Sequence, residues 1–450
     1  MGSERNRSAA TLAVAKVTRA ACVLVVAWGS AFAGAARADD DFRETPEAVQ
    51  TIYRDGAPHT TRQGIVRLTY DAAESFFPIG IYNALLDAGA GPGNFALYAS
   101  TGFNSVFPWP VQDYAAVMDA ARVNALQVVV RDPTDSSLPR FANDPIVLGY
   151  ELDHEPSMHS QAETALWRLE AFRDRLAVVR GFDPRRPIFT VNAPSITPPH
   201  RNSWLAYAEA GDLICFWKYP FFKAPVRTMV QPRSLPEVAS LAAEVSHERK
   251  PVWYVAQAFR SPINNWFMPS EDQANAMIYA GVIHGATGII WFAQDSYGGR
   301  VAKLLGASPD PPRAYPVPAG EGGAAKPIPV TEQDLESSRR MWRAIERLNG
   351  ELAALGPVIL SPTSRRDYRV AVRGTSASPT PIRTLLKDGP EGPVLLVVNI
   401  DADAVTARFT FGEPLAALEP AFGGAPAPTV ADGVWTEQIE AWGVRVYRLR

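Results

Sequence analysis

The stretch VLGYELDHEPS, residues Val147–Ser157, begins as an apolar run and ends in carboxylates followed by a proline. Side chains alternate between the two faces of a β-strand, so Glu151, Asp153 and Glu155 are expected to project to one side. Pro156 cannot donate to a strand ladder and marks the expected end of the strand. Like charges repel, so at least one of the three carboxylates should have a raised pKa, which is typical of acid–base chemistry.

Seven similar apolar runs accompany this stretch, and helical stretches lie between them. The eight expected strands lie within residues 76–84, 102–109, 125–133, 145–156, 186–194, 212–220, 251–259 and 287–295. Strands that are apolar on both faces belong to parallel sheets covered by helices, which predicts an α/β fold built on a (β/α)8 TIM barrel. A doubly wound open sheet is the competing interpretation, but the first strand lacks a glycine-rich phosphate turn.

Changes in sequence texture divide the chain into four parts. We expect a signal peptide over 1–38, an N-terminal extension with a hairpin over 39–75, and the barrel over 76–355. Short strands separated by glycine, proline and aspartate follow over 356–450, which predicts a small antiparallel β-sandwich.

The first residues have the layout of a secretory signal. A basic start precedes an apolar core, and Ala36–Ala38 provide small residues at the expected cleavage site before Asp39. Cleavage would remove five basic residues and one acidic residue, which lowers the formal net charge from −3 to −7. The sequence therefore predicts a secreted or periplasmic protein, with a retained membrane anchor as the alternative.

Charge and cysteine content exclude several classes of partner. No basic run stands out in a chain of net charge −3, so nucleic acid is not expected as a partner. Once the signal is cleaved, no membrane association is expected. Cys215 is the single cysteine after residue 38, which leaves no intrachain disulfide and no cysteine-based metal site, and it should be a buried packing residue. We expect no cofactor and no metal.

Position on the expected barrel suggests roles for individual side chains. Residues at the carboxyl ends of barrel strands line the active site, and Glu155 comes last on its strand, which makes it the best-placed general acid. Glu151 is expected to balance the charge of Arg131. Trp109 and Trp291 fall near strand ends and are expected to present flat faces to sugar rings.

Four segments resemble the catalytic barrel of clan A glycoside hydrolases. They are GYELDHEP (149–156), DLICFWKYP (212–220), KPVWYVAQAF (250–259) and HGATGIIWF (284–292). The resemblance implies a carbohydrate substrate, Glu155 as the acid/base residue, Tyr219 near the catalytic centre and Trp291 at the tryptophan position of the clan. It covers most of the chain after residue 38, and the final strands resemble the β-sandwich that many such enzymes carry.

Two positions depart from the pattern of the clan. His154 replaces the usual asparagine before the acid/base residue, and Gln257 stands where the seventh strand would supply the nucleophilic glutamate. An amide cannot form a glycosyl–enzyme intermediate, so the retaining mechanism is in question. Gln257, His154 and Tyr82 are expected to contact the sugar.

Three alternatives to the retaining mechanism are open. In the first, the enzyme inverts, with Asp295 or Asp132 as the base that activates water. In the second, the substrate assists: ELDHEP also resembles the Asp-x-Asp-x-Glu strand of family 18 chitinases, which implies that Asp153 orients an N-acetyl group beside Glu155. In the third, the barrel binds carbohydrate without cleaving it. A lyase or a transglycosylase on the same barrel would differ in its products.

Overall fold

The computed structural model describes most of the chain from Asp41 onward. The described residues are 41–84, 93–109, 114–158, 162–198, 200–223, 225–230, 234–262, 265–293, 314–315, 328–423 and 426–450. The expected signal peptide (1–38) lies outside them. Within the described part, none of the helices combines the length and the apolar character that a membrane crossing requires.

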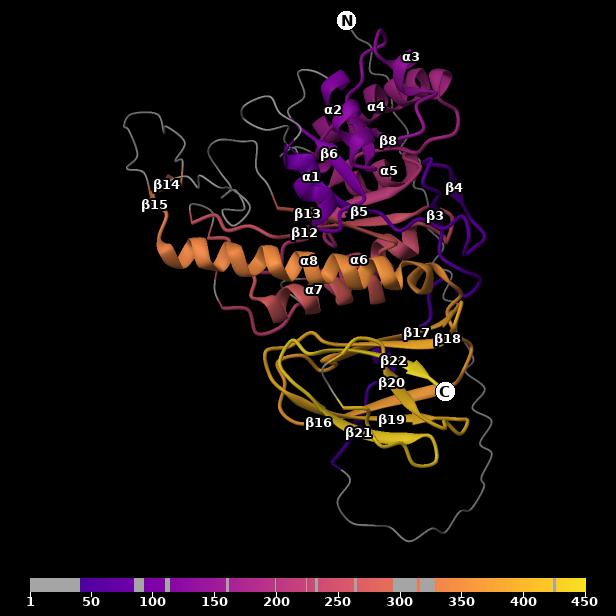
Figure 1. Cartoon of the computed structure of the whole chain (residues 1–450), viewed down its shortest axis with the longest axis vertical. Coiled ribbons are helices and arrows are strands. Elements are labelled where there is room, and N and C mark those ends of the chain that lie inside the picture. The colour runs from indigo at the N-terminus through magenta and orange to yellow at the C-terminus, as the bar shows by residue number, and fades with distance from the viewer. Residues whose placement is uncertain are drawn as a thin grey trace, which may run out of the picture. The chain divides into compact units, whose positions relative to one another are not determined.

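A parallel barrel forms the larger part of the fold (Figure 1), as the sequence predicts. Its strand order is β10-β11-β12-β13-β5-β6-β7-β8-β9, and every neighbouring pair is parallel. The strands are β5 (Ile79–Ala84), β6 (Ser105–Pro108), β7 (Gln127–Arg131), β8 (Val147–Glu151), β9 (Ile188–Phe189), β10 (Val191–Asn192), β11 (Ile214–Trp217), β12 (Val252–Gln257) and β13 (Gly288–Phe292).

The sheet closes through a fifth strand that is interrupted at Thr190. Before the interruption β9 pairs with β8, and after it β10 pairs with β11. Nine short strands therefore occupy the eight positions of a (β/α)8 barrel. This closure brings the carboxyl ends of all eight strand positions to one mouth, where a barrel of this kind places its active site.

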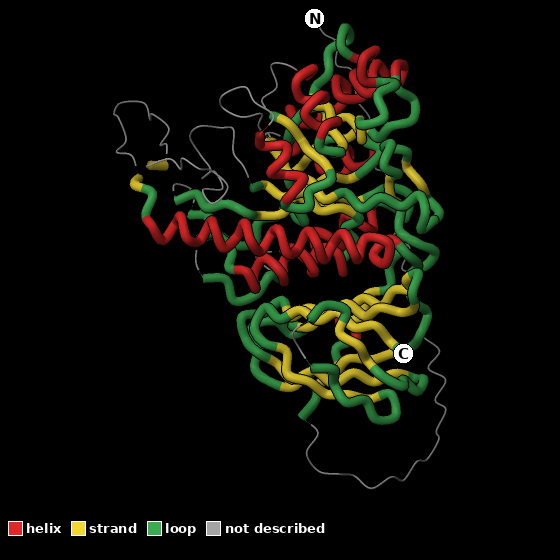
Figure 2. The backbone as a smooth tube through the Cα atoms, viewed as in Figure 1, coloured by secondary structure: helices red, strands yellow, loops and turns green. Residues whose placement is uncertain are grey.

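Helices cover the outside of the barrel (Figure 2). They are α1 (Gly93–Ser100), α2 (Tyr114–Val123), α3 (Leu138–Phe141), α4 (Ala162–Phe182), α5 (His200–Ala210), α6 (Leu235–Val245), α7 (Glu271–Ile283) and α8 (Glu332–Leu360), while the 3₁₀ turn η2 (Pro156–Met158) follows β8 at the mouth. Helix α7 begins with the expected capping box, in which Ser270 and Gln273 bond each other's backbone N–H. Helix α8 continues past Gly356 and ends at Leu360.

The barrel interior is a packed core. Large side chains fill it, among them Trp253, Phe189 and Phe107, whose rings meet edge to face. Cys215 lies in the same cluster with 1% exposure, which confirms its expected packing role. Such filling is typical of a barrel of eight strands and leaves the mouth as the place for chemistry.

The residues before the barrel belong to two structures. Strands β3 (His59–Thr60) and β4 (Val66–Arg67) form the expected hairpin. Strands β1 (Arg43–Glu44) and β2 (Val49–Gln50), joined by the 3₁₀ turn η1 (Pro46–Ala48), instead pair with strands near the C-terminus. The N-terminal extension therefore contributes an edge to each sheet of the sandwich, which the sequence analysis did not foresee.

The C-terminal part is the predicted β-sandwich. One sheet has the order β1-β16-β19-β21 and the other the order β2-β17-β18-β22-β20. The strands are β16 (Tyr368–Arg373), β17 (Ile382–Gly389), β18 (Gly392–Asn399), β19 (Val405–Phe411), β20 (Leu418–Pro420), β21 (Val434–Ile439) and β22 (Val444–Leu449), and a two-stranded pair comprises β14 (Ala314–Tyr315) and β15 (Ile328–Pro329). Helices α7 and α8 pack on β17 (Figure 1), so barrel and sandwich form one unit.

Candidate active site

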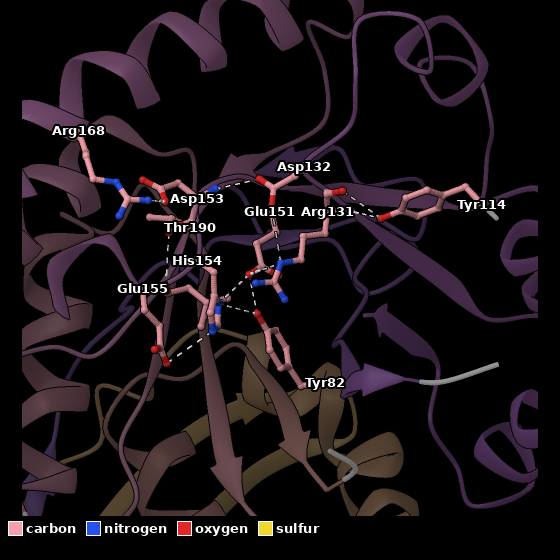
Figure 3. A network of polar contacts seen from close by, with 11 residues as sticks. Tyr82, Tyr114, Arg131, Asp132, Glu151, Asp153, His154, Glu155, Arg168 and Thr190 are labelled. Atoms are coloured by element: carbon pink, nitrogen blue, oxygen red, sulfur yellow. Dashed lines mark hydrogen bonds and ion pairs between the residues drawn. The ribbon is translucent and has the colours of Figure 1, made fainter. Parts of the chain in front are cut away.

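A network of polar side chains lies where strands β5, β7 and β8 end (Figure 3). Tyr82 from β5, Arg131 from β7 and Glu151 from β8 converge there. The hydroxyl of Tyr82 donates to Oε1 of Glu151 at 2.5 Å, and Nε of Arg131 lies 3.6 Å from the same oxygen. The expected charge balance between Glu151 and Arg131 is therefore confirmed.

A shift in strand register turns Glu151 toward the interior. Leu148 belongs to the interior cluster, and strict alternation would place Glu151, three residues later, on the opposite face. The register of β7 against β8 shifts between Val128 and Val129, so one extra residue of β8 is accommodated there. The shift brings the Glu151 carboxylate to Tyr82, which lies in the interior cluster.

The environment of Glu151 favours its ionised form. Burial by itself raises the pKa of this carboxyl, which is 1% exposed, but Arg131, His154 and the Tyr82 hydroxyl outweigh burial and hold the pKa below its usual value. Burial and the Glu151 charge raise the pKa of Tyr82 well above its ordinary value. Glu151 is thus a carboxylate and Tyr82 a neutral hydrogen-bond donor at neutral pH.

His154 connects this buried pair to Glu155. Its Nδ1 lies 3.2 Å from Oε1 of Glu151 and 3.1 Å from the Tyr82 hydroxyl, and its Nε2 lies 3.6 Å from Oε1 of Glu155 (Figure 3). The imidazole stacks on the Tyr82 ring at a centroid distance of 5.9 Å. The Glu155 side chain is 34% exposed: it lies beside His154 and is partly open to solvent.

The expectation of one continuous acidic strand face is wrong beyond Glu151. Strand β8 ends there, and Asp153 and Glu155 have left-handed backbone conformations with φ of 52° and 51°. These torsions break the alternation, so His154 turns toward Glu155 instead of away from it. Non-glycine residues in this region carry strain that is concentrated at functional sites.

Asp153 points toward helix α4 (Figure 3). Its carboxylate forms an ion pair with Arg168, and its backbone carbonyl accepts a hydrogen bond from the Thr190 hydroxyl. Its backbone N–H donates to Oδ1 of Asp132 at 3.1 Å. The predicted catalytic residue Asp153 is therefore placed as an anchor of the turn that carries His154 and Glu155.

Asp132 directly follows β7 and is the second carboxylate at this part of the mouth. Its side chain is 50% exposed, and its Oδ2 lies 3.8 Å from Nε of Arg131. Burial raises the pKa of Asp132, the hydrogen bond from the Asp153 N–H lowers it, and the charge of Glu151 raises it further, with a net upward shift. Asp132 is not one of the three carboxylates for which crowding predicts a raised pKa, and burial is the largest cause of its shift. Of those three, Glu151 has a lowered pKa.

Gln257 ends β12 on the other side of the mouth and has no exposed surface. Its Oε1 accepts from the Phe221 N–H at 3.1 Å, and its Nε2 donates to the carbonyls of Phe221 and Phe267 at 3.1 and 2.9 Å. Backbone groups therefore occupy both ends of the amide. Gln257, which is expected to bind sugar, instead joins the loop that carries Phe221 to the loop that carries Phe267.

Aromatic rings gather beside Gln257. Tyr219, which is 9% exposed, stacks on Trp217 at 4.6 Å and parallel to Phe292 at 6.1 Å. The ring of Phe292 also meets that of Tyr82 at 6.1 Å, so the aromatic group reaches the acidic network. Tyr219 lies two residues past the end of β11.

Trp291 lies on the outer face of β13. It has no exposed surface, and its Nε1 donates to Oδ1 of Asn349 on α8 at 2.9 Å. Phe292 takes the inward position beside Ile290. This placement does not support the expected sugar platform. The alternation in GIIWF contained the signal, since Ile290 and Phe292 share a face and Trp291 has the other.

Trp109 and Asp295 are the remaining predicted residues. Trp109 follows β6, and the Arg131 guanidinium lies 4.0 Å above its ring, which gives a cation–π contact at the rim of the network. Asp295 lies outside the described residues. Among the residues that the structure describes, no cluster of three histidine, cysteine, aspartate or glutamate side chains has the arrangement of a metal site.

The sequence matches no protein-family model and no curated protein sequence. Among solved structures, a catalytic mutant of a GH42 β-galactosidase from G. stearothermophilus is similar at TM-score 0.51 and 8% identity, over 83% of this chain and 98% of that one. AmyP in complex with maltose covers 89% and 95% at TM-score 0.47 and 9% identity.

A β-galactosidase from the Antarctic haloarchaeon Halorubrum lacusprofundi covers 62% of this chain at TM-score 0.45 and 11% identity. This chain spans 58% of that protein. The likeness to the GH42 enzyme establishes a shared glycoside-hydrolase-like fold. Because fold does not determine activity, function has to be argued from the residues at the mouth.

Proposed function

We propose that this chain hydrolyses O-glycosidic bonds of a poly- or oligosaccharide, with Glu155 as the general acid. The observation that carries the proposal is the position of the Glu155 carboxyl. It lies past the end of β8 with a side-chain exposure of 34%, and it is held through His154 by the buried Glu151. A general acid needs this combination of access to the substrate and fixed orientation.

The second carboxylate of the proposed reaction is Asp132. Glu155 gives its proton to the glycosidic oxygen while the bond from the anomeric carbon to that oxygen breaks. A water molecule attacks the anomeric carbon from the opposite face, and Asp132 takes the proton of that water. The raised pKa of Asp132 supports this role, because a base is most effective when its pKa approaches the working pH. The outcome is inversion.

Two observations argue against the substrate-assisted and the retaining mechanisms; Asp295, the other candidate for the base, lies outside the described residues. Asp153 is engaged by Arg168, which argues against its orienting an N-acetyl group. Gln257 offers no nucleophile, and its amide is engaged by backbone groups on both sides. The aromatic surfaces of Tyr219 and Phe292 would then face the sugar.

The layout of residues 1–38 supports action outside the cytoplasm, in the periplasm or the medium, after removal of the signal.

A second candidate function is carbohydrate binding without cleavage. The observation that favours it is Gln257, because the strand position that supplies a nucleophile in retaining enzymes is here used to clamp two loops. A protein that has lost catalysis would keep the barrel and its aromatic surfaces and would not require the link from His154 to Glu155.

The test is product release from a broad polysaccharide panel, including N-acetylated glycans. Purified wild type is compared with Glu155→Gln and with Glu209→Gln, a control on the exposed surface of α5. Release by wild type and the control, but loss of about 10²–10⁴-fold in Glu155→Gln, supports the proposal. Binding of a glycan by all three proteins without release from any substrate contradicts it and favours the binding protein.

A further inference from the structure

A cavity lies at the end of the barrel opposite to the network around Glu155. Its volume is about 810 Å³, which falls in the range of roughly 300–1,000 Å³ for small-molecule sites. The hairpin β3–β4 and the segments that directly precede β5, β8 and β9 form its walls. These segments lie at the amino ends of the strands, so the cavity shares no residue with the network around Glu155.

Backbone contacts fix the walls of this cavity. The tip of the hairpin, Gly64 with φ of 75°, lies so close to the barrel that an added Cβ would be 2.2 Å from the carbonyl oxygen of Leu148. In the loop before β9, Oδ1 of Asp183 accepts from the backbone N–H groups of Arg185 and Arg186 at 3.2 and 3.3 Å. Fixed walls lower the entropic cost of binding a ligand.

The cavity carries uncompensated positive charge. Of its four arginines, Arg67 pairs with Glu74 at 2.7 Å, and Arg186 pairs with Asp183 at 2.6 Å. Arg62 and Arg185, by contrast, have no carboxylate of the described residues within 4 Å.

The two unpaired guanidiniums come from different segments. Arg62 lies in the hairpin, with its guanidinium 5.2 Å from the ring centroid of Phe76, and Arg185 lies in the loop before β9. The whole chain has a net charge of −3, so two guanidiniums in one cavity with no carboxylate of the described residues within 4 Å are a local exception. A charged wall of this kind raises the local concentration of anions.

We infer that this cavity is a binding site for an oligosaccharide that carries carboxylate groups. The planar fork of a guanidinium matches a carboxylate in a bidentate pair, and two forks on different segments suit two charges spaced along one ligand. The amides of Gln63 and Asn143 line the same cavity and can bond hydroxyl groups. Such a site would retain the protein on an acidic polysaccharide, independently of any chemistry at the mouth.

The experiment measures binding to the full-length chain by calorimetry with trimers of galacturonate, glucuronate and mannuronate. The probes for comparison are the methyl-esterified trimers and inorganic phosphate. Arg62→Gln/Arg185→Gln is compared with Arg249→Gln/Arg366→Gln, which removes two exposed arginines that also have no carboxylate of the described residues within 4 Å. Circular dichroism checks that all variants are folded.

The expected result is that a uronate trimer binds and that its ester does not. Removal of Arg62 and Arg185 should weaken binding about tenfold or more for each guanidinium, and the control pair should leave binding unchanged. Added salt should weaken the interaction. Glu155→Gln should bind the trimer as wild type does, so failure of the proposed hydrolysis leaves this result unaffected.

Several results would overturn the inference. Equal binding of the ester would remove the role of charge, and phosphate binding as tight as that of the trimer would reduce the site to a simple anion site. Unchanged binding in Arg62→Gln/Arg185→Gln, loss of binding in Glu155→Gln, or no binding of any uronate trimer would each show that this cavity does not hold the ligand.

Discussion

The two sides of the barrel mouth use buried polar groups in opposite ways. On the side of β5, β7 and β8, Glu151 is bonded to side chains, and the chain of contacts continues through His154 to the partly exposed Glu155. On the side of β11, β12 and β13, Gln257 is bonded to backbone groups, and its contacts end there. The first arrangement connects a buried carboxylate to a side chain that a substrate can reach, and the second holds loops in place.

This difference shows that position on a strand does not determine the role of a residue. Glu151 and Gln257 both end a barrel strand and are both almost fully buried. Their partners separate them: one is paired with Arg131, and the other is satisfied by main-chain carbonyl and N–H groups. We therefore expect catalysis on the side of Glu151, and substitutions on the two sides of the mouth test that division.

The largest expected effect on activity besides that of Glu155→Gln comes from Asp132→Asn. If Asp132 activates the attacking water, this change should lower kcat by about 10²–10⁴-fold with little change in KM. It should also remove the acidic limb of the pH–rate profile. Asp174→Asn, on the exposed face of α4, is the matched control. Near-normal kcat in Asp132→Asn would exclude it as the base.

Replacing the buried carboxylate should chiefly cost stability. Glu151→Gln leaves Arg131, which is 7% exposed, without its buried counter-charge, so we expect the free energy of unfolding to fall by about 3–5 kcal/mol. Urea unfolding measures this, with Glu209→Gln as the control. A loss within 0.5 kcal/mol or so, the usual size of a surface substitution, would show that the pair does not hold the mouth together.

A smaller loss is expected on the opposite side. In Gln257→Glu, a carboxylate oxygen replaces the amide that donates to the carbonyls of Phe221 and Phe267, which should cost about 1–3 kcal/mol. The variant should gain no retaining activity. Gln438→Glu, exposed on β21, is the control. Retention of configuration in the products of Gln257→Glu would mean that a carboxylate at position 257 acts as a nucleophile, so that both sides of the mouth can take part in catalysis.

The smallest effect is a difference in acid sensitivity. The folded-state pKa of Glu151 lies below its usual value of 4.5, so between the two values the unfolded chain binds more protons. The stability from Glu151 is complete above pH 4.5 and is lost as pH falls through the lower folded-state pKa. Wild type should therefore lose up to about 1.4 kcal/mol per pH unit more than Glu151→Gln in this window.

Unfolding midpoints of both proteins from pH 5 down to pH 3 measure that difference. If the unfolding midpoints of the two proteins change equally with pH, the lowered pKa of Glu151 is contradicted.

Much of the fold could be predicted from residue patterns. The eight apolar runs predict the barrel strands because parallel strands are buried on both faces, and the glycine- and aspartate-punctuated strands predict the sandwich. The pairing of Glu151 with Arg131 could also be expected, since a buried carboxylate requires a counter-charge. These features follow from burial, and the alternation and proportion of apolar residues in the sequence indicate burial directly.

The details of the site depend on local backbone geometry, which the pattern does not record. Left-handed residues at Asp153 and Glu155 turn His154 toward the acid; aspartate tolerates this conformation, but the glutamate at 155 gives no indication of it. The register shift between β7 and β8 falls at Gly149, and a glycine within a strand is only a weak indication of such a bulge. The attachment of β1 and β2 to the sandwich joins residues more than 300 positions apart, beyond the reach of local patterns.

The most direct test of one-sided catalysis is the configuration of the first product. Proton NMR of the anomeric signal, recorded within seconds of adding wild-type enzyme to the substrate that the panel identifies, shows which anomer is released before mutarotation. The account predicts inversion, because Glu155 and Asp132 act on opposite faces of the sugar and Gln257 forms no intermediate. Release of the retained anomer would contradict it and would require a nucleophile that this division of the mouth does not contain.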